Sequence, residues 1–169
     1  MTAEQNRLYR RAYALLKKET PLGRFDCGRL CGGACCKGTE NDGMLLFPHE
    51  EELLAHCGYT ITAAGEGCAM VCGGTCKRDY RPLACRFFPL FPVITVKNGS
   101  PTVAAVRDPR AAGACPLGKG GALSPRFVRA VRRAGKILAR DDEIRAYMEN
   151  MSEELAEITA LQRMLIKED

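Results

Sequence analysis

The chain has 169 residues, of which 46% are hydrophobic, and a formal net charge of +5 when its cysteines are neutral. This length suits a single domain over residues 1–169, and this hydrophobic content excludes intrinsic disorder. The ten cysteines are too few for a small disulfide scaffold, no apolar run could span a bilayer, and the N-terminus does not read as a secretion signal. We therefore expect a cytoplasmic protein whose thiols are reduced.

The first half of the chain carries two helix signals. Residues 2–18 begin with Thr2 and Gln5 in a capping-box pattern and continue with apolar residues at helical spacing. A shorter helix is expected after Phe47, with three glutamates in its first turn and Gly58 at its end.

The second half predicts a β-hairpin and two more helices. Asn98-Gly99 separates two β-rich runs, which is typical of a hairpin. Residues 124–167 predict a helix after Ser124 and a longer one after Asp141, whose heptad-like apolar pattern is consistent with a dimer or with packing inside one chain. The first of these helices has a basic face, for which exposure to solvent is the simplest interpretation. This face comprises Arg126, Arg129, Arg133, Lys136 and Arg140.

Two cysteine-rich segments share the pattern Cys-x3-Cys-Gly-Gly-x-Cys. They begin at Cys27 and at Cys68, and the first ends in a Cys35-Cys36 pair. Thiolates that converge on one metal need tight loops, and Gly-Gly permits the positive φ that such loops require. We therefore expect a mainly α fold with a small β-hairpin, in which an irregular Cys-rich metal-binding centre over residues 24–118 is flanked by N- and C-terminal helices. Cys57 is expected to be a small core residue, and His49 and His56 ordinary helix residues.

The segment from Arg81 to Pro89, Arg-Pro-Leu-Ala-Cys-Arg-Phe-Phe-Pro, is the most specific motif in the chain. Together with the preceding cysteines, it resembles the YkgJ-type cysteine-cluster family of zinc- or iron-chelating domains. The resemblance spans about half the chain, and it implies a set of metal ligands to which the internal repeat adds Cys72. The implied ligands are Cys27, Cys31, Cys35, Cys36, Cys68, Cys76, Cys85 and Cys115.

All-sulfur ligation selects zinc or an iron–sulfur cluster over harder metals. The nine candidate thiols exceed the needs of one four-thiolate site, so two centres, or one centre with spare thiols, are both open. The resemblance extends to the cysteine module of flagellin lysine methylases, which favours an iron–sulfur cluster of the [4Fe–4S] type over zinc.

Metal binding therefore is the expected function, with electron transfer, metal handling or a part in a modification system as its task. The alternative is a zinc-stabilised interaction module that binds a protein partner through the C-terminal helices. The chain has no Ser-His-Asp pattern, phosphate loop or dinucleotide signature, which leaves an enzymatic role undecided. We expect a protein partner and no membrane, and the basic helix, which lacks interleaved aromatic residues, argues against nucleic acid.

Overall fold

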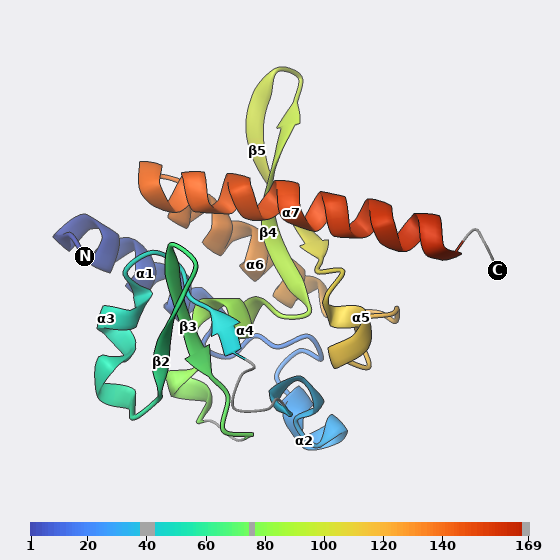
Figure 1. Ribbon diagram of the computed structural model, residues 1–169, viewed down its shortest axis with the longest axis horizontal. Helices are drawn as coiled ribbons and strands as arrows, with labels where there is room; N and C mark the ends of the chain where they lie inside the picture. The colour runs from blue at the N-terminus through green and yellow to red at the C-terminus, as the bar shows by residue number, and fades with distance from the viewer. Residues whose placement is uncertain (38–42, 75–76, 167–169) are drawn as a thin grey trace.

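The computed structural model describes residues 1–37, 43–74 and 77–166, which form helices and two small antiparallel sheets (Figure 1). Among these residues, no helix combines the length and the apolar character needed to cross a bilayer. The first half contains α1 (Ala3–Leu16), α2 (Cys27–Cys31), η1 (Ala34–Cys36), β1 (Gly43–Leu45), α3 (Glu50–Leu54), η2 (Ala55–Cys57), β2 (Ile61–Ala64) and β3 (Gly67–Val71). The second half contains η3 (Arg78–Tyr80), α4 (Leu83–Phe87), β4 (Leu90–Lys97), β5 (Ser100–Arg107), α5 (Ala111–Ala114), α6 (Pro125–Leu138) and α7 (Asp142–Ile166).

The main core lies around the β4–β5 hairpin. The hairpin contacts α6 through both strands and α7 through β4, and α1 packs against α6. In Figure 1, α7 crosses the hairpin, whose tip projects beyond the helix. Large side chains from each layer are fully buried, and they include Tyr9, Phe87, Phe127 and Met148. This burial, at about 25 cal/mol per Å² of apolar surface, is the dominant source of stability.

Several predictions from local sequence signals are confirmed. Thr2 and Gln5 form a complete capping box at the start of α1. Gly58 ends the short helical segment of α3 and η2 with a φ of 74°. Asn98 and Gly99 join β4 to β5 with φ values of 52° and 74°, as the type I′ hairpin turn requires.

The expected fold class is wrong. The protein is not mainly α with one hairpin, because β1, β3 and β2 form a second, three-stranded antiparallel sheet. An irregular Cys-rich centre between flanking helices is not observed either. Cys27 and Cys31 lie in a helix, Cys68 lies in β3, and Cys85 lies in α4.

The second sheet explains why the two cysteine segments differ despite their shared pattern. Along β3, every second residue faces the same side, so Cys68, Met70 and Cys72 share a face. Met70 is buried there with Leu46 and Leu54, and Cys68 and Cys72 pack against this small cluster. Burial of this face favours a strand, whereas the first segment has no such strand partner in the described residues and forms a helix.

A buried carboxylate connects the sheet side of the molecule to α1 and α4. Glu50 is fully buried and accepts hydrogen bonds from the Tyr13 hydroxyl, from Phe47 N at 3.1 Å and from Leu83 N at 2.7 Å. The guanidinium of Arg86 lies 4.6 Å from the centre of the Tyr13 ring. Burial raises the pKa of Glu50, and the hydrogen bonds oppose this shift.

Substituting Glu50 with glutamine is expected to destabilise the protein. Oε1 accepts two of the three hydrogen bonds and Oε2 the third. An amide nitrogen at either position would therefore face an N–H or O–H donor, at a cost of about 1–3 kcal/mol. Urea unfolding of E50Q should show this loss. The matched control is E51Q, because Glu51 is half-buried and its carboxylate forms no hydrogen bond with any described residue. Equal stability of E50Q and wild type would contradict the role of Glu50.

Gly135 is required by the close contact between α6 and the hairpin. A Cβ atom added to Gly135 would lie 2.4 Å from Pro92 Cβ and 2.8 Å from Val103 Cγ1. Alanine normally stabilises a helix relative to glycine by up to about 1 kcal/mol. Here we expect Gly135→Ala to lower the free energy of unfolding by about 1–3 kcal/mol, because the added methyl group would overpack the core. Thermal unfolding should show the opposite or no effect for Gly113→Ala in α5, where a Cβ meets nothing within 4 Å.

Candidate metal centre

The first cysteine segment is a short helix followed by a sharp turn. The Asp26 side chain caps α2 by accepting a hydrogen bond from Gly28 N at 3.2 Å. Gly32 and Gly33 then adopt φ values of 61° and 67°, which reverse the chain before η1. The expectation that the Gly-Gly pair takes positive φ is confirmed for this segment. One turn of helix separates Cys27 from Cys31, so their side chains lie on the same face of α2.

The Cys27 thiol lies in an electrostatic environment set by other site residues. Burial raises the pKa of Cys27, and the charges of Asp26, Cys31 and Cys115 raise it further. Arg81 acts in the opposite direction and lies 3.9 Å from the Asp26 carboxylate. Cys31 and Cys115 therefore lie near enough to Cys27 for their charges to disfavour its thiolate form.

Cys35 and Cys36 are a neighbouring pair at the end of η1. Their sulfur atoms are 4.0 Å apart. The hydrogen bond with Cys36 lowers the pKa of the exposed Cys35 thiol, and the charges of Cys85, Cys27 and Cys115 oppose this change. The pair thus belongs to the same electrostatic neighbourhood as the thiols of α2.

Cys85 lies in α4, whose start is bound to the buried carboxylate of Glu50 through Leu83 N. Arg86, the next residue, points its guanidinium back at the preceding turn and donates to the carbonyls of Arg81 and Asp79, both at 2.9 Å. These contacts fix the segment before α4. Cys85 is therefore positioned by a helix that has tertiary contacts at its start.

Cys115 follows α5, directly after the hairpin. Its N–H donates to Ala111 O at 2.9 Å, which ends the helix. Asp108 holds the start of this segment: its N–H donates to Pro89 O at 3.0 Å, and its carboxylate binds the Arg110 guanidinium at 2.8 Å. Since α5 also contacts η1, Cys115 comes near the first cysteine segment.

Six of the nine predicted metal ligands therefore interact electrostatically or by hydrogen bonding with one another. They are Cys27, Cys31, Cys35, Cys36, Cys85 and Cys115. Cys72 and Cys35 both line a pocket of about 580 Å³, and Ala84 and Ala114, the neighbours of Cys85 and Cys115, line it as well. No disulfide joins any of the nine described cysteines.

Cys68, Cys57 and the two histidines lie elsewhere in the described part of the chain. Cys68 packs against the small core under the three-stranded sheet, and Cys57 packs against it too, although Cys57 is only partly buried and not a core member. Cys76 lies outside the described residues. His56 is exposed in η2. His49 is not an ordinary helix residue, because it precedes α3 with a φ of 62°.

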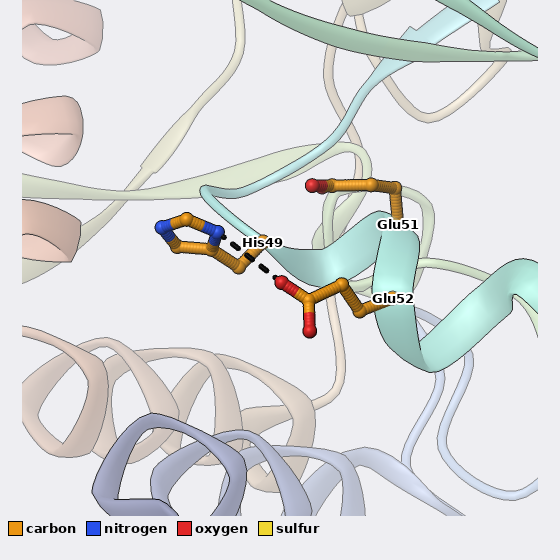
Figure 2. A group of neighbouring side chains, drawn as sticks. All are labelled: His49, Glu51 and Glu52. Atoms are coloured by element: carbon orange, nitrogen blue, oxygen red, sulfur yellow. Dashed lines mark ion pairs between the residues drawn. The ribbon is translucent and has the colours of Figure 1, made fainter. Parts of the chain in front are cut away.

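His49 belongs to a second group of potential ligands, shown in Figure 2 with Glu51 and Glu52. In the described ranges, this is the one set of three or more His, Cys, Asp or Glu ligand atoms within 4.8 Å of one another. His49 Nδ1 lies 3.4 Å from Glu52 Oε1, and Nε2 lies 3.1 Å from Glu143 Oε1. These two contacts explain why the side chains lie together, because they link the start of α3 to α7.

Sequence reasoning missed two residues that organise the thiols, Asp26 and Asp108. An Asp directly before a short cysteine segment is an N-cap signal that could have identified Asp26. Asp108 has a local signal too, since Asp-Pro-Arg after a strand is typical of a turn. The contact of Asp108 with Pro89 is long-range and has no sequence signature.

Comparison with known proteins found no match, whether to a family model, to a curated protein or to a solved structure.

Proposed function

We propose that this protein binds a metal centre through cysteine thiolates. The observation that carries the proposal is the gathering of thiols from three separate segments. The Cys35 and Cys36 sulfurs lie 4.0 Å apart, and α5, which precedes Cys115, contacts η1. Ala84, beside Cys85, lines the same pocket as Cys35. A core cysteine has no need of other thiols around it, whereas a thiolate metal site requires them. Such a site also needs reduced thiols, which is consistent with a cytoplasmic protein.

The chemistry of the donor set supports a bound cation. Burial, and then repulsion from the charges of Asp26, Cys31 and Cys115, raises the pKa of Cys27, and Arg81 offsets only part of this increase. A metal ion or a cluster with a positive core would remove the repulsion and favour the thiolate form. Cys27, Cys31, Cys35, Cys36, Cys85 and Cys115 would hold the metal, with Cys72 at the edge of the adjoining pocket.

The spacing of the thiols favours an iron–sulfur cluster over a single zinc ion. Tetrahedral zinc with bonds of about 2.3 Å places its ligand sulfurs about 3.8 Å apart. In the described ranges, no three cysteine sulfurs meet even a 4.8 Å limit. A [4Fe–4S] cluster spreads its four ligands around a larger core, so it demands less movement of α2, α4 and the Cys115 loop. The cluster would supply one-electron chemistry or serve as the iron source in metal handling or in a modification system.

A second candidate is a zinc-stabilised interaction module. It is favoured by the exposed basic residues of α6, none of which forms an ion pair with a described residue. In this case the metal would be structural, and the C-terminal helices would bind a protein partner.

Protein purified without oxygen is expected to be brown and to contain iron and acid-labile sulfide. Cys85→Ser should lose both, because α4 presents this thiol to the group, whereas Cys57→Ser should retain both. Elemental analysis and visible absorption provide the measurement. A colourless protein with stoichiometric zinc would refute the cluster and support zinc. A protein that binds neither iron nor zinc would refute metal binding.

Chelation separates the redox role from the structural role. For a redox centre we expect the main core around the hairpin to survive metal removal, and a reversible couple to appear in a redox titration. Circular dichroism before and after chelation measures whether the fold survives. A redox role requires both a surviving fold and a reversible couple. Unfolding on chelation without any couple would instead support the zinc-stabilised module.

A further inference from the structure

The exposed side of α6 carries a continuous row of positive charge. Six cationic residues, five of them arginines, are exposed along α6 and the turn that follows it: Arg126, Arg129, Arg132, Arg133, Lys136 and Arg140. At 3.6 residues per turn, they fall within about one third of the helix circumference. We call these six residues the α6 stripe. Arg132 completes the row of five basic residues noted from the sequence.

The fold holds this stripe in a fixed position. The opposite side of α6 is fully buried through Phe127, Val131, Ala134 and Leu138. It packs against α1 and against both strands of the hairpin, and Gly135 allows that close approach. The helix therefore cannot turn its cationic side inward, and the spacing of the charges is set by the helix itself.

The chain does not neutralise the α6 stripe. Among the described residues, none of its six members forms an ion pair, whereas the nearby acids have partners elsewhere. Asp142 binds Arg145 at 2.8 Å, and Glu143 binds His49 at 3.1 Å. Like charges three or four residues apart on a helix repel one another. The stripe thus carries repulsion that an external polyanion would relieve.

One end of the stripe opens into a hollow of about 410 Å³. Lys136, Arg140 and Arg145 line it together with Thr102 and the apolar residues Ile94 and Val103. This end combines positive charge with apolar surface, which suits a carboxylate and an adjacent apolar side chain of a bound polypeptide.

We propose that the α6 stripe is the docking surface for an acidic segment of a partner protein, with carboxylates three and four residues apart. The arginine guanidinium groups match carboxylates in a bidentate geometry. The stripe spans about 21 Å, from 14 residues at 1.5 Å each, and it ends at Asp141 and the exposed Asp142. A short acidic segment with an apolar residue matches both the length of the stripe and the apolar side of the hollow, whereas a phosphate backbone has no apolar group to place there. The proposal does not depend on whether the thiols bind a metal.

The test uses the full chain and three labelled probes. The first is a synthetic peptide of about 16 residues with glutamates at i, i+3 and i+4 positions and a terminal leucine, which matches the length of the stripe. The second is a DNA duplex of about 16 base pairs, which represents a phosphate polyanion. The third is a vesicle containing phosphatidylserine. Fluorescence anisotropy, or co-sedimentation for vesicles, is measured at two salt concentrations.

The variant R129E/R133E reverses two central charges of the stripe. We expect it to weaken peptide binding at least about tenfold, and we expect wild-type binding to fall with salt. The control K119E/R163E makes the same change in net charge at exposed residues outside the stripe and should stay within about twofold of wild type. The neutral variant R129Q/R133Q should give an intermediate loss, and melting curves verify that each variant folds.

Several outcomes would overturn the proposal. Equal loss in the stripe and control variants would mean that binding follows net charge alone. Tighter binding of the duplex or the vesicle than of the peptide, lost in R129E/R133E, would assign the surface to nucleic acid or to membrane. Absence of peptide binding at low salt would leave the stripe as a solvated face.

Discussion

The buried carboxylate of Glu50 determines how the separate parts of this protein meet. Its hydrogen bonds join the Tyr13 hydroxyl of α1, the N–H of Phe47 before α3 and the N–H of Leu83 at the start of α4. A carboxyl group with no exposure is tolerated only when its hydrogen bonds are made, so these three segments must arrive together. The position of Cys85, two residues into α4, follows from this constraint, and so does the position of β1, which leads into α3.

The elements that could be predicted from the sequence are those with local signals. The capping box at Thr2 and the Asn98-Gly99 turn each determine the backbone within a few residues, and both are present. The three-stranded sheet has no such signal. Its strands are short, its pairing joins residues such as Met44 and Met70, and its cysteines were interpreted as ligands instead of as the alternating face of a strand. The helix that carries Cys85 has only five residues, between Pro82 and Pro89, and so has too few residues to show a helical pattern in the sequence.

The same distinction applies to the candidate site. Cysteine spacing identified the residues, but it could not say which of them come together, because that depends on contacts between distant segments. Asp108 N–H donating to Pro89 O is one such contact, and the approach of α5 to η1 is another. Cys68 was included among the ligands that the family resemblance implies, yet the pleat of β3 directs it to the small core with Leu46 and Leu54. The thiols and the α6 stripe lie on different elements, and α1 connects them, since it contacts both α4 and α6.

The hairpin separates Cys85 from Cys115 along the chain but holds them together at its base. Leu90 pairs with Arg107 there, and seven further residue pairs continue the ladder up to Lys97 and Ser100. The tip projects past α7 and is exposed (Figure 1). The strand register at the base of the hairpin is determined by the ladder and by the core below the tip. It therefore does not depend on which residues form the turn. Residues 98–99 are therefore a natural place to lengthen the chain, and a tether or reporter inserted there would leave the spacing of the two thiols intact.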